Sequence, residues 1–242
     1  NAKKEYYLTD IISILYRQGK IIESLTAKKL QEAMGINSRV ELALANKIMQ
    51  KRINHGLMKH GVTIIDPDTT FIAYGAKIGR ESIIYPFTVI QRGVIIGRSC
   101  VVGPFAHLRE GTRLADRVVV GNFLEIVRSR LGEDTWVKHF SYLGDSKIGS
   151  GVNIGAGTVI ANFDGAKKQL TVIKDKAFIG SDTVLVAPVS IGKGAKTGAG
   201  SVVTSRHNVA DHMVVAGVPA RPPPEPITPP RAAMCSAGSG SP

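Results

Sequence analysis

The sequence of 242 residues contains few aromatic residues, two cysteines and no long hydrophobic run. No stretch approaches the roughly 18 consecutive apolar residues that a membrane-spanning helix needs, and no secretory signal opens the chain. We therefore expect a cytoplasmic protein without a membrane span. Cys100 and Cys235 form neither a CxxC pair nor a metal-like cluster, so we predict no metal site. Aromatic content of 6% suits a narrow core with little room for rings.

The charge is unbalanced, with 31 Lys and Arg against 19 Asp and Glu. A formal net charge of +12 can attract nucleic acid, anionic lipid or phosphorylated small molecules. The basic residues are scattered rather than striped, and aromatic residues do not alternate with them as a base-stacking surface requires. The sequence therefore favours phosphate-bearing metabolites as partners over nucleic acid.

Aliphatic residues recur at every sixth position through the middle of the chain. A period of six fits neither a helix, with a period of 3.6, nor a flat strand, with a period of 2.0. It predicts three short strands to a coil, each with one side chain inside a narrow prism, and coils stacked as a parallel β-helix. The first ten positions are Ile72, Ile78, Ile84, Ile90, Ile96, Val102, Leu108, Leu114, Val120 and Ile126.

The repeat continues after two small slips. The later inward positions are Leu131, Val137, Leu143, Ile148, Ile154, Ile160, Ile173, Ile179, Leu185, Ile191 and Val203, with Thr197 as the one polar member. Glycine often follows the inward residue, as in Ile154-Gly155 and Ile179-Gly180. Corners require either a positive φ or a close approach of two backbones, and glycine permits both.

The repeat divides the chain into three parts: a helical region over 1–65, the β-helix over 66–218, and a tail rich in Pro, Ala, Gly and Ser over 219–242. The composition of the tail predicts disorder. Within the β-helix, residues 161–170 leave the repeat and return in phase. Such an excursion predicts a lid or a binding loop.

The helical region carries start and stop signals. An apolar run over 7–16 predicts a first helix, and Thr26 can cap a short helix that ends near Gly35. Ser38 and Glu41 form a capping box that opens a longer helix to about Met58. That helix places Val40, Leu44 and Ile48 on one side and Lys47, Lys51 and Arg52 on another.

Of the six histidines, only His107 and His139 lie between the first and the last of these inward positions, Ile72 and Val203. His139 falls between the two slips, so we expect it at an edge that faces a groove rather than inside the prism. An imidazole that is neutral near pH 7, with cationic groups around it, suits removal of a proton from an amine beside a phosphate. The neighbouring candidates are Arg109, Arg128, Tyr142, Asn153 and Lys168.

Five blocks of sequence resemble one family closely. They are Gly121-Asn122-Phe123, His139-Phe140-Ser141-Tyr142-Leu143-Gly144-Asp145, Asn153-Ile154-Gly155-Ala156-Gly157-Thr158, Asn162-Phe163-Asp164-Gly165-Ala166-Lys167-Lys168 and Phe178-Ile179-Gly180-Ser181-Asp182. The chain is similar to the acetyltransferase half of the bacterial bifunctional N-acetylglucosamine-1-phosphate uridyltransferase/glucosamine-1-phosphate N-acetyltransferase. The similarity covers roughly residues 1–220, and residues 5–10 resemble the end of the other, pyrophosphorylase half.

The resemblance implies a left-handed parallel β-helix that assembles as a homotrimer, with active sites between subunits. It implies that His139 is the general base that deprotonates the amine of glucosamine 1-phosphate for attack on acetyl-CoA, in the synthesis of UDP-N-acetylglucosamine for peptidoglycan and lipopolysaccharide. The implied sugar-phosphate ligands are Arg109, Tyr142, Asn153 and Lys168. The implied contacts of acetyl-CoA are Ala156, through its amide, and Asn162, Phe163, Ser181 and Ala199.

The chain departs from the family in two positions. Val127 stands where the family usually has a phosphate-binding lysine, and Arg128 is adjacent. Because neighbouring side chains of a strand point to opposite faces, Arg128 is not expected to replace that lysine. Phe163 replaces a tyrosine and lacks only its hydroxyl. The glycine-rich nucleotide loop of the pyrophosphorylase half does not occur, so we expect a fragment without uridyltransferase activity.

Two alternative functions stay open at this point. The chain could be another hexapeptide-repeat acyltransferase with a different acceptor, such as serine or another amino sugar, which the change at Val127 favours. It could also be a non-catalytic trimeric scaffold that presents the helical region or the proline-rich tail to a partner.

Overall fold

The computed structural model describes residues 7–27 and 30–223. The chain divides into two compact units, Asn1–Met49 and Gln50–Pro242. The predicted tail lies outside the described residues from residue 224 onward, and so does Cys235. Within the described ranges, no helix combines the length and the apolar character needed to cross a membrane.

The helices are α1 (Asp10–Arg17), the 3₁₀ helix η1 (Leu30–Ala33) and α2 (Arg39–Lys59). The predicted capping box is confirmed, since the Glu41 amide donates to Ser38 Oγ at 3.2 Å. Glu41 Oε2 accepts from the Asn37 amide at 2.7 Å and from the Ser38 hydroxyl at 3.0 Å. These hydrogen bonds, that of Asn37 above all, lower the pKa of Glu41. The short helix expected before Gly35 is only one 3₁₀ turn, because so short a segment gains little without tertiary packing.

The C-terminal half of α2 closes the first coil of the β-helix with a polar side chain. Asn54 is fully buried, and its Nδ2 donates to the carbonyls of Pro67 at 2.9 Å and Thr70 at 3.1 Å. Its Oδ1 accepts from Gln50 Nε2 at 2.9 Å. Asn54 therefore satisfies carbonyls that have no preceding coil to bond. The apolar residues predicted on one side of α2 differ in exposure, and Val40 and Leu44 are exposed.

The predicted parallel β-helix is confirmed. Sheet A contains β1 (Thr63–Ile64), β4 (Ile83–Ile84), β7 (Val101–Val102), β10 (Val119–Asn122), β13 (Trp136–His139), β16 (Asn153–Ile154), β19 (Phe178–Ile179), β22 (Lys196–Thr197) and β24 (Val214–Val215). Sheet B contains β2 (Phe71–Ile72), β5 (Val89–Ile90), β8 (Ala106–Leu108), β11 (Leu124–Val127), β14 (Tyr142–Gly144), β17 (Val159–Ala161), β20 (Val184–Val186) and β23 (Val202–Val203). Sheet C contains β3 (Lys77–Ile78), β6 (Ile95–Ile96), β9 (Arg113–Leu114), β12 (Arg130–Leu131), β15 (Ser146–Ile148), β18 (Thr171–Ile173) and β21 (Val189–Ile191).

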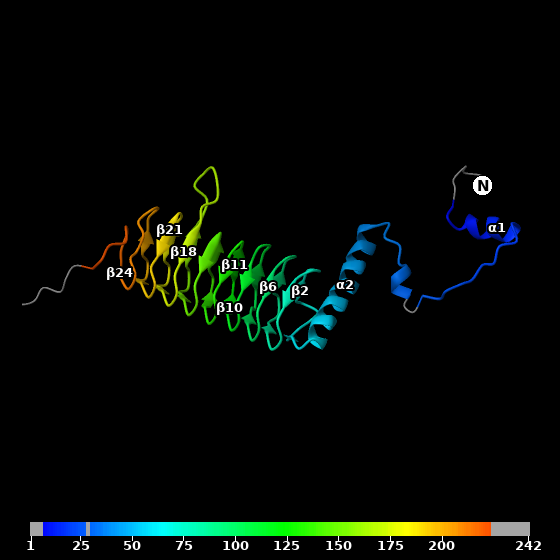
Figure 1. Ribbon diagram of the computed structural model, residues 1–242, viewed down its shortest axis with the longest axis horizontal. Coiled ribbons are helices and arrows are strands. Elements are labelled where there is room, and N and C mark those ends of the chain that lie inside the picture. The colour runs from blue at the N-terminus through cyan, green and yellow to red at the C-terminus, as the bar shows by residue number, and fades with distance from the viewer. Residues whose placement is uncertain (1–6, 28–29, 224–242) are drawn as a thin grey trace, which may run out of the picture. The chain divides into compact units, whose positions relative to one another are not determined.

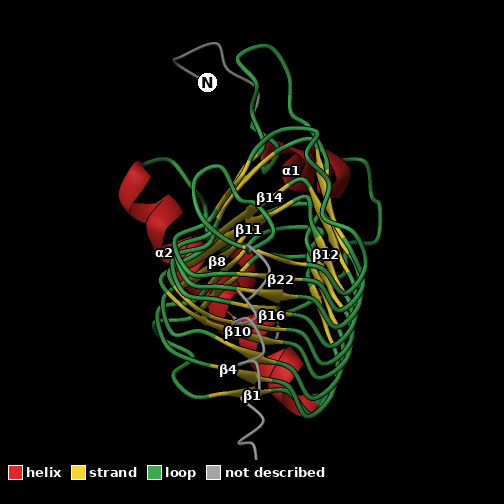
Figure 2. Ribbon diagram, turned by 90° about the vertical axis from the view of Figure 1, so that its left-hand side faces the viewer, coloured by secondary structure: helices red, strands yellow, loops and turns green. Residues whose placement is uncertain are grey.

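Each full coil gives one strand to each sheet, because paired strands are three apart in chain order up to β22. Figure 1 shows the stacked coils, and Figure 2 looks along them and shows the sheets as walls around a common core. The corners between walls are called edge AB, edge BC and edge CA, in the order in which the chain passes them.

The predicted inward residues fill the core and are buried, except Ile78, which is half-buried and packs against the core. Thr197 is also buried. Its hydroxyl accepts from the Gly180 amide at 2.9 Å and lies 3.0 Å from the Thr183 hydroxyl. A polar residue is tolerated in the aliphatic stack because its hydroxyl has partners there.

Glycine at the corners is explained by close backbone approach. A Cβ added at Gly155 would lie 2.5 Å from the amide nitrogen of Ser181, and one at Gly180 would lie 2.6 Å from the carbonyl carbon of Gly198. Neither Gly155 nor Gly180 has a positive φ. Of the two reasons that the sequence allowed, the spacing between coils is the one that applies at these positions.

Candidate functional site

His139 ends strand β13 at edge AB and is exposed, whereas Val137 of the same strand is fully buried. The imidazole therefore lies outside the prism, as predicted. Its Nδ1 lies 3.2 Å from Oδ1 of Asn122, the register partner of His139 in β10. With that oxygen as acceptor, Nδ1 carries the hydrogen and Nε2 keeps the lone pair that a general base needs.

Three predicted acetyl-CoA contacts lie on the same edge as His139. The register of β13, β16, β19 and β22 puts His139, Ala156, Ser181 and Ala199 at one position of four successive coils. Neighbouring coils are about 4.8 Å apart. Ser181 and Ala199 are exposed and Ala156 is half-buried, so this column is open to a ligand that runs along the coil axis.

Two predicted sugar-phosphate ligands, Arg109 and Tyr142, lie on the outer face of sheet B, beside this column. Glu125 of β11 and Tyr142 of β14 are register partners and both are half-buried. Arg109, directly after β8, reaches the neighbouring strand β11 and donates from Nη1 to Glu125 Oε1 at 2.6 Å. Strand β14 is three residues long, about 10 Å at 3.3 Å per residue, so the face between edges AB and BC is narrow.

The two slips in the repeat lie at edge BC. The inward positions Ile126 and Leu131 are five residues apart, as are Leu143 and Ile148, and both intervals join sheet B to sheet C. The next coil carries the excursion, residues 161–170, at the same edge (Figure 1). The edge is thus shortened in two coils and lengthened in the third. The slips do not explain the position of His139, because that residue lies at edge AB.

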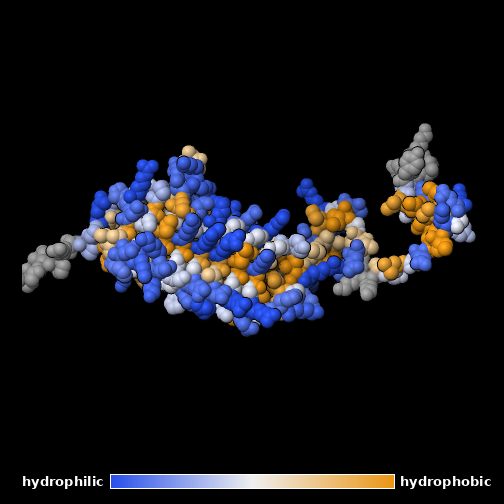
Figure 3. Space-filling view, in the orientation of Figure 1, coloured by the Kyte–Doolittle hydropathy of each residue, from blue (hydrophilic) through white to orange (hydrophobic). Residues whose placement is uncertain are grey.

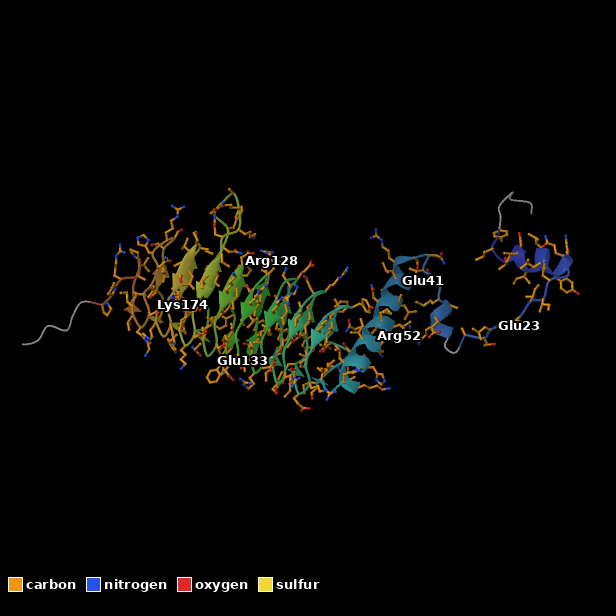
Figure 4. All side chains as sticks on the ribbon, viewed as in Figure 1. Glu23, Glu41, Arg52, Arg128, Glu133 and Lys174 are labelled. Atoms are coloured by element: carbon orange, nitrogen blue, oxygen red, sulfur yellow. The ribbon has the colours of Figure 1, made fainter. Side chains whose placement is uncertain are left out.

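The carboxylate of Asp145 at edge BC binds Arg128 and Asn162 and lies near the charge of Lys168. Arg128 donates from Nε to Asp145 Oδ1 at 2.6 Å and from Nη2 to Oδ2 at 2.7 Å. Asn162 donates from Nδ2 to the same Oδ2. The Arg128 hydrogen bonds chiefly, and then those of Asn162 and the nearby charge of Lys168, lower the pKa of Asp145. Figure 4 shows Arg128 on the side of the coil that carries the excursion.

Asp145 also fixes both ends of the excursion. At the start, its carboxylate accepts from Asn162, and at the end its carbonyl accepts from the Thr171 amide at 3.1 Å. The Gln169 amide donates to the Asn162 carbonyl at 2.7 Å and closes the loop on itself. We call these interactions the Asp145 clamp. The clamp places Lys168, whose Nζ lies 5.5 Å from the centre of the Phe163 ring.

The tip of the excursion has its own acceptor. Asp164 Oδ1 accepts from the amides of Ala166 at 2.9 Å and Lys167 at 2.8 Å, and Oδ2 accepts from Gln169 Nε2 at 2.6 Å. The Gln169 hydrogen bond and then the two amides lower the pKa of Asp164 to about 2. The loop is therefore held in one turn at neutral pH.

Arg128 and Arg109 line one hollow of about 250 Å³, with Val127 between them and Gln91, Glu110 and Gly111 around it. Val127 is buried at 3% exposure. Arg128 has a φ of 46° and belongs to the corner rather than to the strand. The alternation of strand side chains ends at this corner. Val127 and Arg128 therefore line the same hollow instead of lying on opposite faces, as had been expected for neighbours in a strand.

Other predicted residues lie apart within this chain. Asn153 is half-buried on sheet A, in register with Trp136 rather than with His139. Asn162 is buried at edge BC and Phe163 is exposed on the excursion, across sheet B from the other acetyl-CoA contacts. Sequence reasoning missed the partners Asn122, Glu125 and Asp145. Asn122 and Asp145 could have been found by a spacing of 17 residues from His139 and Arg128, whereas the ion pair of Glu125 with Arg109 spans 16 residues and does not follow the coil length.

The comparisons with known proteins agree with the repeat that forms the coil. The family model described as "Bacterial transferase hexapeptide (six repeats)" matches residues 75–110, 128–162 and 170–205. The "Bifunctional protein GlmU" of Thermosipho africanus (strain TCF52B) is 45% identical over 84% of this chain and 52% of the relative. The chain is a homologue of the acetyltransferase half of GlmU.

Other GlmU proteins match in the same way. That of Carboxydothermus hydrogenoformans is 44% identical over 84% of this chain and 53% of the relative. The chain spans about half the length of the GlmU relatives that it matches. Among solved structures, "LpxA from Acinetobacter baumannii" is 14% identical with a TM-score of 0.43, over 66% of this chain and 73% of that chain.

Replacement of Asp145 by Asn should loosen the excursion. The variant loses the charge that holds Arg128 and Asn162, and hydrogen bonds to a charged group contribute about 1.5–3 kcal/mol each. Amide hydrogen exchange over 162–171 should accelerate by roughly tenfold or more.

Asp134→Asn is the matched control, because Asp134 makes the same kind of two-bond pair with Arg117 elsewhere on the coil. It should leave exchange over 162–171 unchanged. Equal exchange in Asp145→Asn and in the unmodified chain would show that the clamp does not hold the excursion.

Proposed function

We propose that the chain transfers the acetyl group of acetyl-CoA to the amine of glucosamine 1-phosphate and yields N-acetylglucosamine 1-phosphate. The reaction belongs to UDP-N-acetylglucosamine synthesis in the cytoplasm. The position of His139 carries this proposal, since it lies between the column of Ala156, Ser181 and Ala199 and the narrow face that leads to Arg109. The GlmU relatives are about twice as long, and we assign only acetyl transfer to this chain.

In this mechanism His139 acts through Nε2. It removes a proton from the amine of the acceptor, and the nitrogen attacks the carbonyl carbon of the thioester. The Ala156 amide stabilises the oxyanion that develops on the carbonyl oxygen. The carbon–sulfur bond then breaks, and the imidazolium of His139 returns the proton to the departing thiolate of CoA.

The phosphate of the acceptor fits the hollow at edge BC. Arg109 and Arg128 both line it, and the clamp holds Lys168 on the loop beside it. Each guanidinium is already paired with a carboxylate, but it has five N–H donors and can serve a phosphate oxygen as well. In this proposal Arg128 supplies the second positive charge that the family usually obtains from a lysine at the position of Val127.

Replacement of His139 by Ala should lower turnover with acetyl-CoA and glucosamine 1-phosphate by roughly 10²- to 10⁴-fold, the range for a lost general base. Release of the CoA thiol measures the rate. His55→Ala is the control, because His55 is exposed on α2, away from edge AB. An unchanged rate in His139→Ala would remove His139 from the mechanism. Absence of any heat with acetyl-CoA in calorimetry would instead favour the scaffold function.

Replacement of Arg128 by Gln should raise the KM for glucosamine 1-phosphate by about tenfold or more, since a charge-assisted contact to phosphate is lost. The rate with unphosphorylated glucosamine should change little. This difference separates loss of phosphate binding from loosening of the excursion, which affects both acceptors. Arg117→Gln is the control. If the unmodified chain used both acceptors equally well, it would be an acyltransferase with another natural acceptor.

We also infer that the working form is a homotrimer. The outward positions Ile83, Val101, Val119 and Trp136 form an apolar column on sheet A. At edge AB the rings of Phe87, Phe105 and Phe123 stack at 4.9 and 4.8 Å and are 52%, 44% and 61% exposed. Apolar side chains also line the coil in Figure 3. Such surfaces are stabilised by contact with another copy.

A neighbouring copy would also bring its Asn162 and Phe163 toward the acetyl-CoA column, which they do not reach within one chain. Light scattering should therefore give the mass of three chains of 25.8 kDa each. A mass of one chain at micromolar concentration, with full activity, would contradict the trimer.

A further inference from the structure

The outer face of sheet C presents a row of positive charges. Arg113 of β9, Arg130 of β12 and Lys147 of β15 are consecutive register partners, and all three are exposed. Register partners of neighbouring strands are about 4.8 Å apart. In the described part of the chain, none of the three forms an ion pair. Like charges that face each other across strands destabilise a sheet, so this row has a cost in the free protein.

The row leads into a hollow of about 440 Å³ that lies toward edge CA. Arg130 and Lys147 line one side, Lys174 and Lys193 line the other, and the side chain of Val172 contributes to an aliphatic floor. The hollow is concave and cationic. It does not share a lining residue with the hollow of Arg109 and Arg128.

The two carboxylates in this hollow are engaged by the protein. Asp175 Oδ1 accepts from the Ser150 amide at 2.8 Å. Asp211 Oδ1 accepts from the Lys193 amide at 2.9 Å and from Lys174 Nζ at 3.1 Å, and these contacts lower the pKa of Asp211. Neither carboxylate forms an ion pair with Arg130 or Lys147, and these two cations have no counter-ion among the residues that the structure describes.

We propose that this row and hollow, the sheet C site, bind a ligand with two or more linked phosphoryl groups, such as inorganic triphosphate or a nucleoside triphosphate. A single phosphate could contact only neighbouring members of the row, whereas a chain of phosphoryl groups runs along it and neutralises several charges at once. The row contains no aromatic residue on which bases of a nucleic acid strand would stack. The site is additional to the proposed acetyl transfer and does not depend on it.

Calorimetry with inorganic triphosphate, on the full chain at low salt, tests the site. Binding should be saturable, should weaken as salt is raised, and should weaken at least tenfold in the double variant Arg130→Gln, Lys147→Gln. The double variant Arg52→Gln, Lys196→Gln loses the same charge outside sheet C, on α2 and on sheet A, and should bind like the unmodified chain. Since the row repels itself, Arg130→Gln, Lys147→Gln should also melt no lower than the unmodified chain without ligand.

A further variant separates this site from the acceptor hollow. Arg109→Gln, Arg128→Gln should lose glucosamine 1-phosphate but keep triphosphate. Equal affinity for inorganic and nucleoside triphosphate would show that the phosphoryl chain alone is bound. Tighter binding of the nucleotide would show that the aliphatic floor also contacts the nucleoside. Absence of saturable binding, equal loss in the charge-matched control, or loss in Arg109→Gln, Arg128→Gln would each overturn the sheet C site.

Discussion

The interior of the prism has room for little more than one aliphatic side chain per short strand, and this limit governs the rest of the molecule. Leu143 and Ile160 are fully buried, while their outward neighbours Tyr142 and Val159 are accessible. Coils packed at strand spacing leave no space for a Cβ at corners such as Gly155. No charged side chain of the described residues is buried, so each charge of the coil is displayed at a fixed position on a wall or an edge. Which side chains can act together therefore depends on which outward positions of successive coils lie in line.

Alignment between coils also explains how His139 acquires its partners. Its hydrogen-bond partner Asn122 comes from the coil before, and the residue in line with it, Ala156, comes from the coil after. Arg128 and Asp145 are related in the same way. The groups that could bind, orient and deprotonate an acceptor are thus distant in sequence but stacked in space. Each depends on the register of its neighbours rather than on its own loop.

The coil, its inward residues, the capping box at Ser38 and the excursion could be predicted, because each leaves a local or periodic pattern. The backbone contacts that close the excursion, from Gln169 to Asn162 and from Thr171 to Asp145, could not, because residues 161–170 leave the repeat and have no periodic spacing. The interpretation of the positive charge as scattered was wrong. Arg113, Arg130 and Lys147 are 17 residues apart, which is the length of the shortened coils, so they fall in one row. Such a row is not visible from the distribution of charge along the chain and appears only when one position is compared from coil to coil.

The coils contact only their immediate neighbours, and this modular stacking has a consequence for how such a protein can change. The first coils, built on β2 to β7, lie before the column that begins at Asn122. Whole coils could therefore be gained or lost there during evolution without a shift in the spacing between His139 and the positions that follow it. Residues gained or lost at edge BC are absorbed at that corner, since the two shortened corners and the excursion leave the strands of sheet A in register from coil to coil.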